Sequence, residues 1–307
     1  MLKYTIKRII SIILTLILVS IATFALMHSI PGGPFTGGEK ALPQKVIDAM
    51  NAKYNLDKPL VVQYLDYMKG AVRFDFGPSY KKIGVKVEDM IAQSFPVSAK
   101  LGLAATVVII VIGIPIGILA ALKNGKWQDY LSTIFATIGI AVPSFVLGSL
   151  ILYLFGAKLG WLPTFGLTSF RHYIGPVITL SGFNVAFVIK LTRSSMLEVL
   201  QQDYVRTARA KGLSKGKVIY KHALKNALIP VVTYIGPTVA GMITGSFVTE
   251  KIFAINGMGR YYVDAITNRD YTTIMGTTLF YAAIAAFAIL LVDIVYALID
   301  PRINLDQ

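Results

Sequence analysis

The sequence contains no cysteine among its 307 residues, and Asp, Glu, Lys and Arg together make up only 15% of it. The absence of cysteine excludes a disulfide framework, thiolate chemistry and a cysteine-ligated metal site. Hydrophobic residues make up 55% of the chain, more than a soluble core of this length needs, which predicts an all-α integral membrane protein in the lipid bilayer. The net charge of +14 does not indicate a nucleic-acid partner, because a nucleic-acid-binding domain is not crossed by apolar runs of bilayer length.

Motifs for catalysis, nucleotide binding and metal binding are also missing. A phosphate-binding loop needs the pattern GxxxxGK[ST], and neither Gly125-Lys126-Trp127 nor Gly216-Lys217-Val218 completes it. The three histidines, His28, His172 and His222, lie in different segments and form no HxxxH or HExxH pair. No GxSxG nucleophile motif is present. The sequence therefore predicts no catalytic residue, no metal site and no cofactor in this chain, and it gives no support for enzyme activity.

Six apolar runs are long enough to cross a bilayer, which takes about 20 residues of helix. The first run could be interpreted either as a signal peptide or as a retained transmembrane helix. It is longer than the ~7–15 apolar residues of a signal peptide, so we expect a retained helix. Pro143 lies inside the third run, where neighbouring helices can satisfy the carbonyl that a proline leaves free. The predicted transmembrane helices are residues 9–30, 101–122, 130–155, 174–191, 227–248 and 274–299.

Lysine and arginine in short loops predict the orientation of these helices, because such loops carry more of both on the cytoplasmic side. By this rule both termini are cytoplasmic. The long loop after the first helix is also rich in lysine, but it exceeds the length of about 60 residues up to which the rule holds. Its stretches Pro43–Tyr54 and Pro59–Val72 have helical spacing and predict short helices outside the membrane. The predicted cytoplasmic segments are 1–8, 123–129, 192–226 and 300–307, and the predicted extracytoplasmic loops are 31–100 and 249–273.

Two features inside the predicted spans concern packing and charge. Gly241 and Gly245 form a GxxxG pair, which predicts close packing against another helix. Asp293 is a carboxylate within the last span, where ionisable residues are costly and often functional. Its position near the cytoplasmic end favours contact with water, or a pair with Lys190 or Arg193, over a proton relay. A single such residue gives little support to ion coupling.

A basic, polar segment separates the fourth and fifth apolar runs. Asp203 is a good helix N-cap residue, and Gly212 is a good residue to end a helix because it adopts a left-handed conformation without a Cβ clash. The short helix predicted between them places Val205, Ala208 and Gly212 on one face and Arg206 and Arg209 on another.

Ser214 then caps a second predicted helix, which carries Lys217, Lys221 and Lys225. Together the two helices make a compact knob with small residues and cations on its surface. Such a knob suits docking against another protein better than it suits chemistry. The alternative is that the cations only set the topology and contact anionic lipid.

This segment also carries a family resemblance. Tyr204–Ser214 and His222–Pro230 resemble the cytoplasmic EAA loop of ABC importer permeases, and more narrowly that of the peptide/nickel branch. Pro31–Gly37 is most similar to the oligopeptide members, and further similar segments extend the resemblance over essentially the whole chain. The match is to the branch rather than to the general pattern, since Arg206 and Lys225 stand where that pattern has glutamate and proline.

The resemblance implies an ABC permease core at 75–299. It also implies that the loop at 192–226 forms a coupling helix, which sits in a cleft of an ATP-hydrolysing subunit. Ala208 and Gly212 keep their places in the family motif, and Arg206 either joins the contact or holds the loop against the membrane-side helices. The residues expected to contact the ATPase are Thr207, Arg209, Lys211, Leu213 and Ser214.

The function that the resemblance implies is that of a permease subunit of a binding-protein-dependent importer for oligopeptides, in a bacterial plasma membrane. The chain would form half of the translocation path. Its partners would be a second homologous permease subunit, two ATP-binding subunits that hold ATP and Mg²⁺, and an extracytoplasmic peptide-binding protein. Dipeptide, nickel and glutathione stay open as substrates. An ion-coupled secondary transporter or channel, the alternative class, would need several buried charges and an inverted repeat, and the sequence offers neither clearly.

Overall fold

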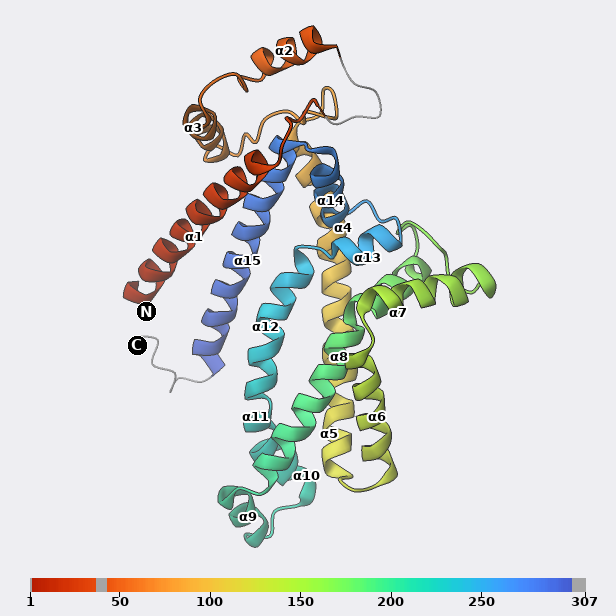
Figure 1. Cartoon of the computed structure of the whole chain (residues 1–307). Coiled ribbons are helices and arrows are strands. Elements are labelled where there is room, and N and C mark those ends of the chain that lie inside the picture. The colour runs from red at the N-terminus through yellow and green to blue at the C-terminus, as the bar shows by residue number, and fades with distance from the viewer. Residues whose placement is uncertain (1, 37–42, 300–307) are drawn as a thin grey trace. The chain divides into compact units, whose positions relative to one another are not determined.

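The computed structural model describes residues 2–36 and 43–299 of the chain (Figure 1). Within these ranges every regular element is a helix, and the only β-type pairing is an isolated antiparallel bridge between Pro78 and Lys86. The predicted all-α fold is therefore confirmed for the described residues. The chain forms two compact units, one from residues 1–98 and 256–307 and the other from residues 99–255.

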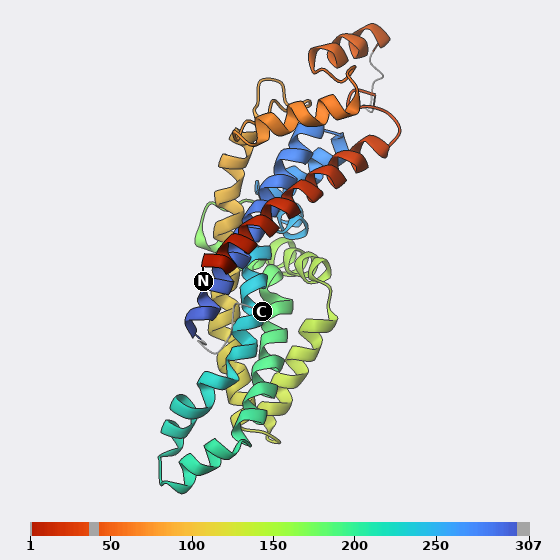
Figure 2. The same ribbon diagram turned by 90° about the vertical axis from the view of Figure 1, so that its left-hand side faces the viewer.

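The first unit is built around the two helices nearest the chain ends, α1 and α15, which pack along each other (Figures 1 and 2). Both predicted short helices of the long loop are present as α2 and α3, and each begins directly after a proline, Pro43 or Pro59. The helices of this unit are α1 (Leu2–Ser29), α2 (Gln44–Lys53), α3 (Leu60–Ala71), the beginning of α4 (Val87–Val108), α14 (Met258–Asn268) and α15 (Tyr271–Ile299).

A buried carboxylate fixes the start of α15. Asp270 is only 4% exposed, and its oxygens accept hydrogen bonds from the Ser79 hydroxyl, from the Tyr80 backbone N–H at 2.9 Å and from the Thr273 hydroxyl at 2.8 Å. Burial, with the charge of Asp270 as a smaller cause, raises the pKa of Tyr80 to about 12. The network thereby ties the segment around Tyr80 to α15.

The second unit is organised around α8, its longest helix, which packs against α5, α6, α7 and α12. Close approach is possible because the neighbouring helices present glycines. A Cβ atom on Gly117 would lie 2.6 Å from the Cβ of Thr192, and one on Gly139 would lie 2.7 Å from the Cβ of Ala186. The elements of this unit are the end of α4, η1 (Ile109–Gly113), α5 (Ile114–Leu122), α6 (Trp127–Ala141), α7 (Ser144–Ile151), η2 (Leu152–Lys158), α8 (Phe170–Leu200), α9 (Asp203–Ala210), α10 (Lys215–Lys217), η3 (Val218–Ala223), α11 (Leu224–Ala227), α12 (Ile229–Ile243) and α13 (Phe247–Ile252).

An ion pair joins α8 to α6. The Arg193 guanidinium donates from Nε to Asp129 Oδ1 and from a terminal nitrogen to Asp129 Oδ2 at 2.8 Å, and it also donates to the Asn124 side chain at 3.1 Å. The Asp129 side chain is only 5% exposed. Asp293, for which the prediction is contact with water or a pair with Lys190 or Arg193, lies in a part of α15 where the structure describes the backbone alone. The predicted cytoplasmic tail, 300–307, lies outside the described residues.

Four helices of the described chain are long and apolar enough to cross a membrane, and six spans result if each of two bent helix pairs counts as one. This agrees with the six predicted spans. However, the helix of the second span begins at Val87 rather than at 101, and the third is broken by a 100° bend between α6 and α7 at Val142 and Pro143. The polar stretch 249–273, predicted as a loop, also contains most of α13 and the whole of α14.

Within the 99–255 unit, the predicted close packing of the glycine pair in the fifth span is not found. Helix α12 ends at Ile243, so Gly245 lies beyond it, in a left-handed conformation with φ of 99°. A Cβ atom on Gly241 would meet no atom within 4 Å. The GxxxG spacing therefore does not mark a helix contact within this unit.

We expect Arg193→Ala to lower the free energy of unfolding by about 3 kcal/mol, because it leaves the buried Asp129 carboxylate without its charged partner. This is the lower end for a buried pair, since the Arg193 side chain keeps 29% of its surface exposed. Arg193→Lys keeps the charge but loses the two-pronged geometry, so an intermediate effect is expected. Thermal unfolding of the purified protein in detergent measures both. An unchanged midpoint for Arg193→Ala would show that the pair is dispensable.

Candidate coupling site

The basic segment folds as the predicted knob, here defined as residues 203–227, and it projects from one end of the second unit (Figures 1 and 2). The first helix, α9, has Gln202 and not Asp203 at its N-cap, which corrects the predicted cap. Asp203 instead lies in the first turn, where its negative charge interacts favourably with the positive end of the helix dipole. Its carboxylate also forms an ion pair with Arg206 at 3.6 Å.

Gly212 ends α9 as predicted. It adopts φ of 74°, and its N–H donates to the Arg209 carbonyl at 3.0 Å. Lys211, the residue before it, caps the helix with its N–H bonded to the Thr207 carbonyl. A left-handed conformation is strained for residues with a Cβ atom, so this tight turn depends on glycine.

The knob has a small core of its own. Val205 and Ala208 share one face of α9, as predicted, and this face packs against Val218 of η3; the three residues are 0%, 5% and 2% exposed. Ala208 was expected on the docking surface, and the structure places it inside instead. Gly212 does not share that face, because it lies beyond the end of α9 and is exposed. Any part that Ala208 plays in docking is therefore indirect.

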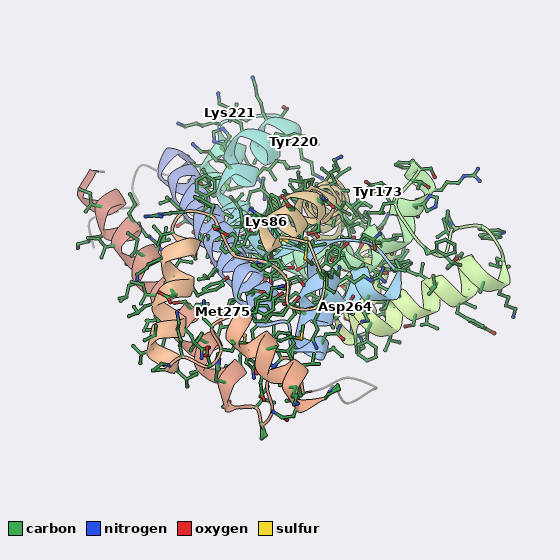
Figure 3. The ribbon with its side chains drawn as sticks, turned by 90° about the horizontal axis from the view of Figure 1, so that it is seen from above. Lys86, Tyr173, Tyr220, Lys221, Asp264 and Met275 are labelled. Carbon is green, nitrogen blue, oxygen red and sulfur yellow. The ribbon has the colours of Figure 1, made fainter. Side chains whose placement is uncertain are left out.

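Cations and polar groups cover the outer surface of the knob. Arg206 is exposed there and pairs with Asp203, so it does not hold the loop against the spanning helices. In Figure 3 the labelled Tyr220 and Lys221 lie beside each other on η3, and Tyr220 is 72% exposed. Of the other predicted contact residues, Thr207, Arg209, Lys211 and Ser214 are exposed and Leu213 is partly buried.

One set of contacts attaches the knob to the rest of its unit, and another holds the helices of the knob together. Ile219 and Ala227 pack in one buried cluster with Ala121 of α5 and Met196 of α8. Within the knob, the Asn226 amide donates to the Tyr204 hydroxyl at 2.7 Å, which links α11 to α9. Sequence reasoning missed this bond, because 22 residues separate the pair and no local pattern connects them.

The predicted second helix is present as a continuous helical stretch from Lys215 to Ala227 with a π-helical middle, η3. Ser214 precedes it as the N-cap residue, although its side chain makes no capping hydrogen bond. A groove of 430 Å³ runs between the knob and the ends of α5 and α8, with Arg209 and Lys215 among its lining residues. The groove can accept an acidic side chain from a docking partner.

No group of three or more His, Cys, Asp or Glu side chains that could hold a metal ion occurs among the residues described. His28 and His172 instead make local hydrogen bonds, to the Phe24 carbonyl and to Ser169 respectively. The described residues therefore combine helices of membrane length with an exposed basic knob, which is the arrangement of an integral membrane protein.

The family models agree with this class. "Binding-protein-dependent transport system inner membrane component" matches residues 113–305, and the model of the N-terminal part of such components matches residues 1–104. The chain therefore belongs to the family of inner membrane components of binding-protein-dependent transport systems. It is accordingly a multi-pass protein of the bacterial inner membrane.

Curated relatives match over the whole chain. The dipeptide transport system permease protein DppB of Bacillus subtilis is 47% identical, with 100% of this chain and 99% of the relative covered. The oligopeptide transport system permease protein OppB of Salmonella typhimurium is 42% identical, with 99% of this chain and 100% of the relative covered. This confirms the resemblance to peptide permeases of ABC importers.

Among solved structures, the MetNI methionine ABC transporter in an inward-facing conformation matches with a TM-score of 0.56. The match covers 69% of this chain and 96% of the other chain, at 16% sequence identity. At that identity the likeness shows the fold alone.

We expect Gly212→Ala to loosen the knob. The new methyl group meets no atom within 4 Å, so the cost is backbone strain of about 1 kcal/mol. Gly216→Ala is the matched control, because Gly216 is also exposed and unobstructed but lies within α10, where alanine favours the helix. Limited proteolysis of the exposed Lys and Arg sites should therefore be about fivefold faster for Gly212→Ala and no faster for Gly216→Ala. Equal cleavage of the two variants would contradict the assigned turn.

Proposed function

We propose that this chain is the permease subunit of an ATP-driven importer of peptides. The relatives that match the whole chain at 42–47% identity are named for oligopeptide and for dipeptide transport. Peptide is the substrate class that these names share. The observation that carries the mechanism is the exposed, basic knob built onto the ends of α5 and α8.

In the proposed arrangement the knob, both termini and the loop at 123–129 face the cytoplasm, and the segments 31–100 and 249–273 face outward. A second, homologous permease subunit completes the translocation path. Two ATP-binding subunits, which hold ATP and Mg²⁺, dock on the knobs, and an extracytoplasmic binding protein delivers the peptide. The distribution of Lys and Arg in the short loops supports this orientation.

Coupling follows from how the knob is attached. ATP binding closes the pair of ATPase subunits, and the knobs move with them as rigid bodies. The buried cluster of Ile219, Ala227, Ala121 and Met196 transmits this motion to α5 and α8. Arg193 and Met196 of this cluster both lie on α8. The ion pair between Arg193 and Asp129 therefore passes the motion on to α6. The helices then rock between inward-open and outward-open states.

We predict that Gly212→Asp abolishes co-purification of the ATPase subunits while the second permease subunit is retained, because a branched anion strains the turn and opposes the basic surface. Gly216→Asp is the control, since it adds the same charge at another exposed position of the knob. Affinity purification from the native membrane, with the co-purifying chains identified by mass, measures the outcome. Loss of the ATPases in both variants would assign the effect to charge alone, and retention in both would refute docking through this turn.

A second prediction concerns the substrate. Cells that lack this chain should lose uptake of radiolabelled dipeptides and pentapeptides, or of one of the two lengths, and should keep uptake of ⁶³Ni²⁺. Because Pro31–Gly37 resembles the oligopeptide members, we expect the pentapeptide to be among the lost substrates. Restoring the chain from a plasmid controls for other effects of the deletion. Loss of nickel uptake with normal peptide uptake would show that the chain belongs to a nickel importer instead.

A further inference from the structure

The break between α6 and α7 leaves backbone polar groups inside a predicted span. The two helices bend by 100° at Val142 and Pro143. The end of one helix and the start of the next each leave several backbone groups without an intrahelical partner. At membrane depth, irregular backbone is tolerated only where protein buries it or where it lines a polar cavity. The break therefore needs either protein packed around it or a polar cavity beside it.

A cavity of 370 Å³ lies beside this break, within the second unit. Its walls come from the end of α6, the start of α7, the middle of α8 and the segment that enters α13. Ser144, Asn184, Ser246 and Thr249 contribute polar groups, Leu180 and Phe183 are among the apolar ones, and none of the lining residues carries a charge.

Asn184 places the cavity at mid-membrane depth. It lies 14 residues after the first residue of α8, Phe170, and 16 residues before the last, Leu200. At 1.5 Å per residue it is roughly 21 Å and 24 Å from the two helix ends. A hydrocarbon core about 30 Å thick therefore encloses this point.

The Tyr234 hydroxyl fixes the orientation of the Asn184 side chain and leaves its amide hydrogens available to donate to a ligand. The Tyr234 hydroxyl donates to Asn184 Oδ1 at 2.7 Å, and the Tyr234 ring stacks on Phe187 with 4.3 Å between ring centroids. Within 43–291, no protein acceptor takes the two amide N–H groups of Asn184. Ser246 donates to the Thr249 hydroxyl and accepts from the Thr249 N–H, so among the polar lining residues Asn184 and Ser144 keep the most hydrogen-bonding capacity for an occupant.

We propose that this cavity is a subsite for the peptide backbone on the translocation path. Asn184 donates to a peptide carbonyl and Ser144 exchanges hydrogen bonds with the adjacent amide, while Phe183 and Leu180 contact the peptide side chain. Because the polar contacts are neutral and go to the backbone, the subsite accepts peptides regardless of side-chain charge. A metal cargo would need carboxylate, imidazole or thiolate ligands, and the cavity lining has none. This inference rests on the proposed function.

The first test uses the complete importer in proteoliposomes, with a radiolabelled tripeptide and saturating loaded binding protein. Asn184→Leu should lower the uptake rate about fivefold, the effect of one hydrogen bond, while ATP hydrolysis and subunit composition stay normal. Tyr234→Phe should lower the uptake rate about twofold, because loss of the Tyr234 hydroxyl leaves the Asn184 amide free to rotate. Thr137→Val is the control, since it removes an exposed hydroxyl from α6 outside the cavity and should leave uptake unchanged. Normal uptake by Asn184→Leu would overturn the subsite.

A second measurement does not depend on tolerance of the Asn184 substitution. Since the native chain has no cysteine, Phe183→Cys places a single thiol at the cavity wall, and Phe135→Cys places one on α6 away from it. A tripeptide with a bromoacetyl group on a lysine side chain should alkylate the first thiol during turnover, with loss of bromide, and not the second. Equal labelling of both, or labelling of neither while peptide is transported, would overturn the subsite. If the wild-type importer transports no peptide, the proposed function itself fails.

Discussion

The close packing of α8 against α5 and α6 is the constraint on which the rest of the 99–255 unit depends. Gly117 and Gly139 lack side chains, so α8 approaches both backbones within van der Waals distance. Between helices in lipid the hydrophobic effect gives no net attraction, so such contact must supply it. The pair between Arg193 and Asp129 adds a directed link at the end of the same interface. Since α8 ends at Leu200 and α9 begins at Asp203, the knob continues a tightly packed unit.

Hydropathy and helical spacing predicted most of the helices, because α1, α2, α3 and α15 each show their pattern within one continuous segment. The bend in the third span was not predictable in this way. A proline at 143 signals a kink, but the 100° angle is set by α6 packing on α8 while α7 packs on both α8 and α13. Helix α14 was missed because its stretch reads as polar, although Met258 and Ala265 are buried on one face at helical spacing.

For the candidate site, residues whose role depends on local geometry were predicted better than those that depend on distant partners. The prediction that Gly212 ends α9 was correct, because a left-handed conformation at a helix end favours glycine whatever residues surround it. Ala208 was placed on the surface because its partner, Val218, belongs to the next helix. The bond between Asn184 and Tyr234 joins residues 50 positions apart, so a single sequence could not reveal the polar cavity beside it. The contacts of the exposed cations with an ATPase stay a prediction.

The central claim is that the knob and the helices around α8 move as one body. Spin labels on cysteines introduced at Lys211 of the knob and Leu131 of α6, both exposed, test it directly in a chain that has no native cysteine. The label-to-label distance would be measured in the assembled importer, without nucleotide and with ATP trapped. The account predicts a change of no more than about 2 Å, the size of helix shifts within packed structures. A change of about 5 Å or more, one helical turn, would contradict it.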